Sequence, residues 1–200
     1  MCKSATAEIR AMTRQQLLTS LILAVSCASL VFAQDRRDSP TGAGAVPEMT
    51  RLANALAGDW NNVESMESSE WFPNGGERKG TSHCGVGTGG TTLICQGDSD
   101  GSAGRLDHLI VIWWDKDTNL YRFFTCFKDR GSGCEIRGTG HWQADTFVND
   151  YTENVKGKQK RMRDSFIDIT ANSHTLIEAI EIGDRNMLTL ITTKSSRGSR

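Results

Sequence analysis

The sequence contains little proline and carries almost no net charge. Only three of its 200 residues are proline, against twenty glycines, which favours tight turns over proline-rich linkers. Its 23 lysines and arginines nearly balance 24 aspartates and glutamates, so the formal net charge is −1. A chain with this balance has no long-range attraction for nucleic acid or for an anionic membrane. We therefore predict no nucleic-acid partner.

The sequence also lacks the motifs of common catalytic and metal centres. None of its four histidines forms the paired arrangement of a helical zinc motif, and no Gly-x-Ser-x-Gly nucleophile elbow occurs. Residues Gly85–Gly90 match Gly-x-Gly-x-x-Gly, but the strand-like segment Thr91–Cys95 follows where a dinucleotide site needs a helix. These observations predict a glycine-rich hairpin loop, no metal site and no cofactor.

The N-terminal segment has the pattern of a secretory signal. Arg10 and Arg14 precede an apolar run, Leu17–Phe32, and Val31–Ala33 fits the small-x-small cleavage rule. The run has about 16 residues, fewer than the roughly 20 that cross a bilayer as a helix. The pattern therefore predicts export rather than stable insertion in a membrane.

Three regions follow from this pattern. We expect residues 1–33 to be a cleaved signal peptide and residues 34–46, which are small and polar, to be a flexible leader. Residues 47–200 are long enough for one domain with a substantial core. The mature protein is then expected to be secreted or periplasmic.

Four of the six cysteines lie beyond the predicted signal: Cys84, Cys95, Cys126 and Cys134. An even number in an exported chain indicates disulfides, and four cysteines allow three connectivities. We favour the pairs 84–95 and 126–134, because each pair flanks a plausible hairpin loop. A zinc site is the competing interpretation, since His83 adjoins Cys84, but no Cys-x-x-Cys spacing supports it.

The periodicity predicts one helix followed by strands. Residues 47–57 place apolar side chains at helical spacing between Pro47 and Gly58. Short runs of β-branched and aromatic residues follow, separated by turn residues. The predicted strands are 59–66, 69–72, 78–85, 91–96, 108–114, 120–128, 135–143, 146–155, 161–170, 175–183 and 187–193. The strand 108–114 is apolar on both faces, so we expect one face inside and the other against the helix.

This order predicts an all-β fold, an antiparallel up-and-down β-barrel of about eight to ten strands with one short N-terminal helix. Short hairpins join every predicted neighbour, and a meander of this length avoids exposed edges by closing on itself. A barrel of this size either fills its interior with side chains or keeps room for a small ligand. The sequence leaves both outcomes open.

Three motifs resemble a known family. They are Leu56–Trp60, then Ile112–Asp115 with Tyr121 after it, then Gly138–Trp142. Together they are similar to the secreted bacterial proteins grouped as domain of unknown function 1579 (DUF1579), within the calycin and lipocalin-like superfamily. The resemblance covers about residues 48–197 and implies a calycin-like barrel. It implies no activity, because the family has none that can be carried over.

The resemblance also implies a contact between the two ends of the barrel. In lipocalins a tryptophan of the first strand packs under a basic residue of the last strand. Trp60 fits the first role, and Lys194 or Arg197 fits the second. This chain departs from the family in its four cysteines and in Trp114, where the family often has tyrosine.

The leading functional hypothesis is binding of a small apolar or amphipathic molecule inside the barrel, without catalysis. Aromatic burial would supply the affinity and a few polar groups the orientation. The wall residues predicted on this basis are Trp60, Trp71, Trp113, Phe124, Trp142 and Arg163, with His141 as a further candidate. One alternative is a small exported enzyme or haem-binding barrel that uses His141. Another is a structural or interaction protein with a filled barrel.

Overall fold

A computed structural model describes residues 46–128, 133–134, 136–155 and 157–198. The predicted signal peptide, and the predicted leader except for Val46, lie outside the described residues. Within the described part of the chain, no helix is both long and apolar enough to cross a membrane.

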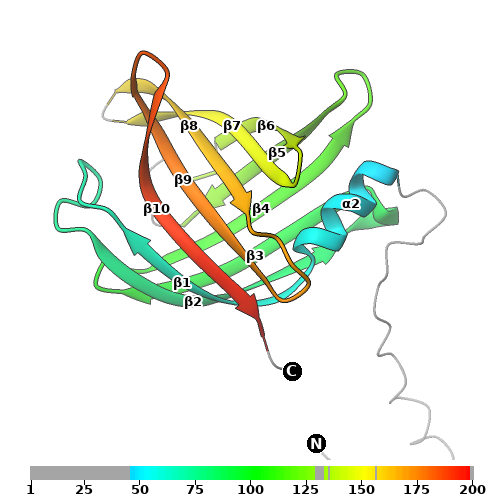
Figure 1. The fold of residues 1–200 in the computed structure, drawn as a ribbon, viewed down its shortest axis with the longest axis horizontal. Coiled ribbons are helices and arrows are strands. Elements are labelled where there is room, and N and C mark those ends of the chain that lie inside the picture. Colours follow the sequence, from blue (N-terminus) through cyan, green and yellow to red (C-terminus); the bar gives the residue numbers. More distant parts are fainter. Residues whose placement is uncertain (1–45, 129–132, 135, 156, 199–200) are drawn as a thin grey trace, which may run out of the picture. The chain divides into compact units, whose positions relative to one another are not determined.

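Among the described residues, one α-helix precedes ten antiparallel strands, and Figure 1 shows how they are arranged. Each strand pairs with its neighbour in the sequence, and the last pairs with the first, which closes the barrel. The predicted fold class is therefore confirmed. The elements are α2 (Pro47–Leu56), β1 (Gly58–Met66), β2 (Gly76–Val86), β3 (Thr92–Gly101), β4 (Leu106–Asp115), β5 (Leu120–Phe127), β6 (Ile136–Gln143), β7 (Thr146–Val155), β8 (Lys158–Ile167), β9 (Ser173–Gly183) and β10 (Asn186–Arg197).

The register determines which side chains point into the barrel. Strand β1 buries Trp60, Asn62, Glu64 and Met66 and exposes the residues between them. Because successive strand side chains point to opposite faces, the register of each antiparallel pair extends this choice to the next strand. Trp60 lies opposite Ser82 and Arg197. The inward position of Trp60 therefore sets the inward positions along the regular stretches of the ladder, and register shifts near Asn186 and Thr189 interrupt this parity in β10.

Both predicted disulfides are present, Cys84–Cys95 and Cys126–Cys134. Cys84 and Cys95 are directly opposite each other on β2 and β3, on the inner face. Cys126 lies opposite Leu109, at an outward position of β5. The Cys84–Cys95 bond therefore cross-links the inner face of the barrel wall, and the Cys126–Cys134 bond cross-links a short segment at its outer face.

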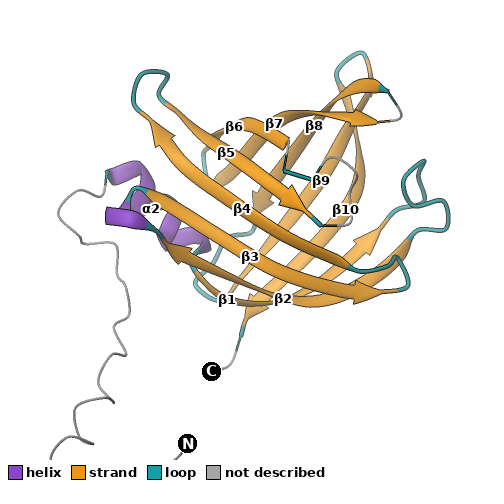
Figure 2. Cartoon of the chain, turned by 180° about the vertical axis from the view of Figure 1, so that it is seen from behind, coloured by secondary structure: helices purple, strands orange, loops and turns teal. Residues whose placement is uncertain are grey.

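Helix α2 lies at one end of the barrel, beside the first residues of β3 (Figure 2). Its buried face, which includes Met49, Leu52 and Leu56, joins the apolar core. The helix ends at Leu56; Ala57 follows with an extended backbone, and Gly58 has φ +133°. The guanidinium of Arg197 occupies the space that a Cβ at position 58 would need. Glycine is therefore required there on two counts.

Hydrogen bonds fasten α2 across this end. The Tyr121 hydroxyl donates to the Glu48 carbonyl over 2.7 Å, and Arg51 Nη2 donates to the Ala144 carbonyl over 2.6 Å. Because Ala144 lies in the turn between β6 and β7, the helix bridges to the wall opposite β1. The barrel is thus capped at the end where β1 begins.

The cap corrects one expectation about β4. Both faces of this strand are apolar, and α2 was expected to cover the outer one. The helix instead packs on inward-facing residues, and Leu109, Val111 and Trp113 remain half-exposed on the outer face. Because α2 closes one end of the barrel, it contacts the inner side of the wall and leaves the outer face of β4 uncovered.

A second expectation was also wrong, because residues 69–72 form no strand. They belong to the loop between β1 and β2, where the Ser69 and Gly75 amides both donate to the Phe72 carbonyl. Local turn hydrogen bonds replace those of a ladder. The predicted glycine-rich loop at Gly85–Gly90 is confirmed, with a short 3-10 turn at Thr88–Gly90 between β2 and β3.

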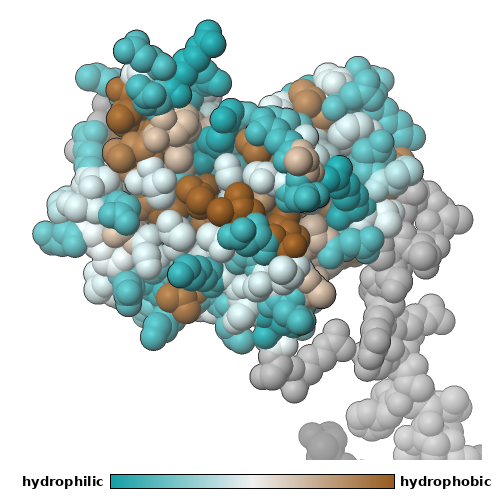
Figure 3. Space-filling view, viewed as in Figure 1, coloured by the Kyte–Doolittle hydropathy of each residue, from teal (hydrophilic) through white to brown (hydrophobic). Residues whose placement is uncertain are grey.

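The outer surface is largely hydrophilic, with a local apolar cluster on the β9–β10 hairpin. Ile182, Met187 and Leu188 are exposed there, by 61%, 36% and 46%. Hydrophobic atoms gather in the upper left of Figure 3, where this hairpin lies. The cluster lies near the barrel end opposite α2.

Candidate functional site

The barrel interior contains a cavity of about 110 Å³ that is partly open to solvent and is lined by residues from α2 and all ten strands. Half of these lining residues are apolar or form the inner disulfide: Leu56, Trp60, Cys84, Cys95, Leu106, Ile110, Ile112, Phe123, Phe127, Ile136, Phe166 and Leu176. The other half carry polar or ionisable groups: Asn62, Glu64, Ser82, His108, Thr125, Asn149, Tyr151, Asp164, His174, Glu178, Thr193 and Ser195. The inner wall is therefore amphipathic rather than a purely apolar core.

One polar chain on this wall is internally satisfied. Ser195 Oγ donates to Asn62 Oδ1 over 2.9 Å, and Asn62 Nδ2 donates to Ser82 Oγ over 3.0 Å. These bonds join β10, β1 and β2, and they fix the orientation of the Asn62 amide. This part of the wall stabilises the closure between the first and last strands.

A buried ion pair between Glu64 and Arg78 begins two residues after Asn62 on β1. Glu64 Oε2 accepts from Arg78 Nε over 2.8 Å and lies 2.6 Å from Arg78 Nη2, and both side chains are nearly inaccessible to solvent. Glu64 lines the cavity, whereas Arg78 does not. The positive charge of Arg78 is therefore committed to Glu64, because an unpaired charge at this depth would be very costly.

Two further carboxylates face the cavity from β8 and β9. Asp164 and Glu178 are directly opposite each other, and Asn149 lies opposite Asp164 on β7. The Tyr151 hydroxyl donates to Asp164 Oδ1 over 3.2 Å. Asn149 is 4% exposed, and its Oδ1 has no hydrogen-bond partner within the described part of the chain. This row combines two carboxyl groups with a buried amide oxygen that has no donor among the described residues.

Two histidines complete the polar wall, and burial lowers the pKa of both. The pKa of His174 falls to about 4, mainly through desolvation and further through the positive charge of Arg197. Desolvation is also the main cause of the lowered pKa of His108. The His174 ring meets the Trp60 ring edge to face at 4.5 Å, and its Nδ1 has no partner among the described residues. Both imidazoles are thus neutral at pH 7.

Only one of the predicted wall residues lines the cavity, and that residue is Trp60. Trp142 also points inward, but it belongs to the cap: its Nε1 donates to the Tyr121 hydroxyl over 3.2 Å, and Arg51 lies over its ring. Trp71 lies in the loop between β1 and β2, packed against the core. Of the three tryptophans Trp60, Trp71 and Trp142, the structure therefore places only Trp60 on the cavity wall, as predicted.

The remaining four candidates lie on the outer face, which corrects their predicted place on the wall. Trp113 and Phe124 are at outward positions, and Arg137 lies over the Phe124 ring. His141 Nε2 is 2.9 Å from the Gln143 amide nitrogen. Arg163 Nε donates to Asp150 Oδ1 over 2.8 Å. The cause is strand parity, because a shift of one residue moves a side chain to the other face.

The polar residues of the inner wall were missed, although the sequence contains a signal for them. Asn62 and Glu64 recur at two-residue spacing from Trp60, and Asn149 and Tyr151 recur in the same way from Phe147. Polar residues in phase with the buried positions of a strand indicate a polar interior.

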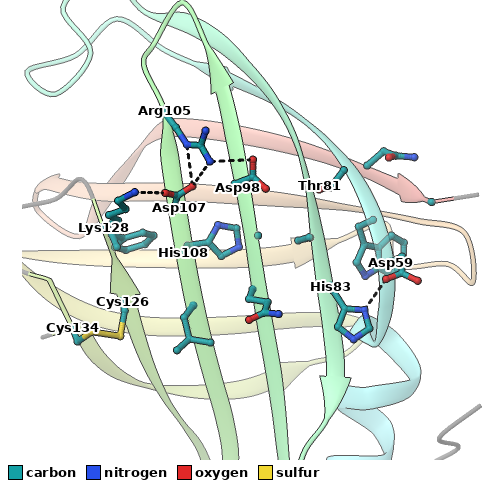
Figure 4. A pocket seen from close by; sticks show the side chains of 18 of the residues that line it. Asp59, Thr81, His83, Asp98, Arg105, Asp107, His108, Cys126, Lys128 and Cys134 are labelled. Atoms are coloured by element: carbon teal, nitrogen blue, oxygen red, sulfur yellow. Dashed lines mark hydrogen bonds and ion pairs between the residues drawn. A yellow bond between two sulfur atoms is a disulfide. The ribbon is translucent and has the colours of Figure 1, made fainter. Parts of the chain in front are cut away.

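A second depression, of about 910 Å³, lies on the outer face of β1–β5 (Figure 4). Arg105 Nη2 lies 3.1 Å from Asp107 Oδ1, and Lys128 Nζ lies 3.3 Å from Asp107 Oδ2. The hydrogen bond from Arg105 is the main cause of the lowered pKa of Asp107. At the other side His83 Nδ1 lies 2.6 Å from Asp59 Oδ1. These groups pair with one another in solvent, so the inner cavity is the stronger candidate site.

No protein-family model and no curated protein matches the chain. Among the solved structures that match it, two share its fold over most of the chain. The S-type phycobiliprotein lyase CPES from Guillardia theta has a TM-score of 0.55 and 10% identity, with 75% of this chain and 92% of that chain covered. Rv2717c from M. tuberculosis has a TM-score of 0.54 and 11% identity, with 78% and 99% covered. At this identity the likeness establishes the fold alone.

Proposed function

We propose that this chain is an exported binding protein that holds a small amphipathic molecule in the barrel cavity and performs no chemistry on it. One observation carries the proposal: the barrel interior keeps a space of about 110 Å³ whose wall is half apolar and half polar or ionisable. The apolar side chains would supply affinity by burial, at about 25 cal/mol per Å² of apolar area. The polar groups would fix the orientation of the bound molecule.

The size of the cavity restricts the ligand. Sites for drug-sized molecules enclose roughly 300–1,000 Å³, whereas a cavity of roughly 150 Å³ accommodates benzene. A space of about 110 Å³ suits a molecule of a few non-hydrogen atoms. Because half of the wall is polar, an amphipathic ligand is favoured over a wholly apolar one.

The same geometry weakens the haem hypothesis that involved His141. That histidine lies on the outer face beside Gln143, so it cannot ligate a group held inside the barrel. A porphyrin is also much larger than the cavity. The filled-barrel alternative is distinguished from the proposal by the binding experiment below.

Export is a further part of the proposal. Two disulfides are compatible with an extracellular location, and the predicted signal over residues 1–33 would direct the chain there. Membership of the DUF1579 family remains a hypothesis that rests on the three motifs, Leu56–Trp60, Ile112–Asp115 and Gly138–Trp142.

Native mass spectrometry of the full chain, expressed in a secreting host and purified without denaturation, tests the proposal. We expect an N-terminus near Gln34 and a small added mass that leaves on denaturation. Thr125→Leu adds volume to the cavity wall and should reduce the added mass, whereas Thr139→Leu, at an outward position of β6, should not.

The contradicting result is equally specific. It is a wild-type protein without added mass, whose melting temperature no small-molecule fraction of the culture medium raises. That outcome would favour a filled barrel that acts through its outer surface.

A further inference from the structure

We infer that the Cys126–Cys134 bond is a site of thiol–disulfide exchange, at which a dithiol is oxidised while the bond is reduced. This activity goes beyond the binding of a ligand in the barrel and does not depend on it. The inference rests on three features of the bond: its exposure, its place beyond the end of a strand ladder, and the depression that adjoins it.

The two disulfides differ in exposure. Cys84 and Cys95 are 8% and 7% exposed and lie on the inner face of the barrel. Cys126 is half-buried and Cys134 is exposed, and both line the outer depression. A thiolate must reach a sulfur atom in order to attack it, and exposed disulfides are the labile, regulatory or catalytic ones. The outer bond is therefore the one that an external thiol can reach while the barrel stays folded.

The outer bond can also open without opening the barrel wall. Pairing between β5 and β6 ends at Thr125 and Ile136, and both cysteines of the outer bond lie beyond this last pair. Cys126 is held on β5 by the pairing with β4, which continues to Phe127. The inner bond, by contrast, joins two residues that are directly opposite each other within the β2–β3 ladder. Reduction of the outer bond therefore breaks no pair of the β5–β6 ladder.

The depression on the outer face of β1–β5 provides room for the attacking thiol (Figure 4). Its volume of about 910 Å³ lies in the range of sites that accommodate drug-sized molecules, roughly 300–1,000 Å³. Two cations line it, Arg105 and Lys128. Each pairs with Asp107, and Arg105 also lies 3.7 Å from Asp98. The two cations balance the two carboxylates, so an incoming thiolate meets no net repulsion from them.

The exchange consists of two displacements at sulfur. A thiolate of the dithiol attacks Sγ of Cys134, the more exposed cysteine, and forms a mixed disulfide while Sγ of Cys126 leaves as a thiolate. The second thiolate of the dithiol then attacks its own sulfur in the mixed disulfide, and Sγ of Cys134 leaves. Two electrons pass from the dithiol to the protein, and the two protons that the dithiol loses are taken up by the two cysteine thiolates. The partner retains a new disulfide.

The first experiment locates the reactive bond. The full chain, secreted with both bonds formed, is treated with dithiothreitol at pH 7, quenched with iodoacetamide at successive times and analysed by peptide mass spectrometry. We expect Cys126 and Cys134 to be alkylated at least about 100-fold faster than Cys84 and Cys95, because the inner bond is reached only by local unfolding. The near-ultraviolet circular dichroism should be retained. Equal rates at the two bonds would overturn the inference.

The second experiment distinguishes exchange from simple lability toward a strong reductant. A reduced synthetic peptide with two cysteines is mixed with an equimolar amount of the oxidised chain at pH 7 without oxygen. Mass spectrometry follows the peptide disulfide, and we expect one outer bond to be lost for each peptide disulfide formed. A chain that oxidises no peptide would contradict the inference, even if dithiothreitol reduces its outer bond.

A double variant supplies the matched control. Cys126→Ser with Cys134→Ser retains the inner bond and should oxidise the peptide at least about tenfold more slowly than the wild type. Peptide oxidation by this variant at the wild-type rate would show that the outer bond is not the oxidant. Should the variant fail to fold, the wild-type stoichiometry and the alkylation rates still decide. Because none of these readouts involves the cavity, their failure is distinguishable from failure of the binding proposal.

Discussion

The guanidinium of Arg197 lies over the indole ring of Trp60, with its Cζ 4.0 Å from the ring centroid. Its Nη1 also donates to the Ala57 carbonyl over 2.7 Å, and its Nη2 to the Ala171 carbonyl over 2.9 Å. The indole Nε1 donates to the Leu56 carbonyl over 2.9 Å. The last strand thus holds the end of α2, the first strand and the turn before β9 together.

This contact resolves an alternative that the family resemblance had left open. The resemblance implied a basic residue of the last strand above Trp60, with Lys194 and Arg197 as the candidates. Arg197 is opposite Trp60 and shares its inward face, whereas Lys194 is opposite the outward-facing Val63. Parity within β10 therefore selects Arg197.

Replacing this arginine should destabilise the barrel markedly. We expect Arg197→Met to lower the free energy of unfolding by about 2–3 kcal/mol, because charge-assisted hydrogen bonds and a cation–π contact are lost together. Lys194→Met is the control and should change it by less than about 0.5 kcal/mol. Urea unfolding followed by tryptophan fluorescence measures both, and equal effects of the two substitutions would contradict the assignment.

The buried pair of Glu64 and Arg78 should respond unequally to single and double replacement. Arg78→Met leaves a buried carboxylate without its partner and should cost about 3–5 kcal/mol. Combining it with Glu64→Leu should recover most of that loss, since the uncompensated charge is removed. Arg163→Met breaks the half-exposed pair with Asp150 and should cost at most about 1 kcal/mol. Chemical unfolding of the wild type and the three variants tests this, and a double variant no more stable than Arg78→Met would argue against it.

Stability should fall with acid because of His174. Its folded-state pKa of about 4 is depressed below the unfolded value of about 6.5, so the unfolded chain binds the proton more readily. The stabilising contribution is complete above pH 6.5 and is lost as the pH falls toward 4, by up to about 3 kcal/mol.

His174→Leu should flatten this part of the stability profile, which unfolding experiments between pH 4 and pH 7.5 would measure. His141→Leu, on the outer face, provides the matched control and should retain the wild-type slope. His108 contributes in the same direction, because burial lowers its pKa as well. A slope unchanged by His174→Leu would show that another group is responsible.

The two disulfides should differ in their importance. Each closes a short loop, and removing either should cost about 2–4 kcal/mol. The Cys84–Cys95 bond also lines the cavity, with both residues less than 9% exposed. Cys84→Ala with Cys95→Ala should therefore reduce the melting temperature more than Cys126→Ala with Cys134→Ala. Calorimetry of the two double variants tests this order, and the reverse order would contradict the role given to the inner bond.

Much of the fold could be predicted from local patterns. The helix after Pro47, the hairpin connections and both disulfide pairs follow from spacing within short segments, and each is confirmed. The segment 69–72 was misassigned because Trp71 and Phe72 suggest a strand, while the turn bonds of Ser69 and Gly75 decide otherwise. Such turns compete with sheet structure through contacts that a sequence pattern does not contain.

The candidate site could not be located in the same way. Alternation of polar and apolar residues along a strand indicates that its two faces have different surroundings. Which face points into the barrel depends on the neighbour with which the strand pairs. In β4, where both faces are apolar, the sequence contains no parity signal at all, and Trp113 was assigned to the wrong face. The inward position of Trp60, extended by register from strand to strand, assigns the face of Trp113 and of the other residues in the regular stretches of the ladder.

The sequence by itself determined the all-β class, the order of the strands and the cysteine pairs, because each depends on residues close together along the chain. Only the tertiary structure decided that Asn149, Asp164 and Glu178 share one inner wall and that Trp113, Phe124, His141 and Arg163 do not. The physical reason is barrel closure. It joins β1 to β10, sets the register of all ten strands and thereby chooses one of two faces for each side chain.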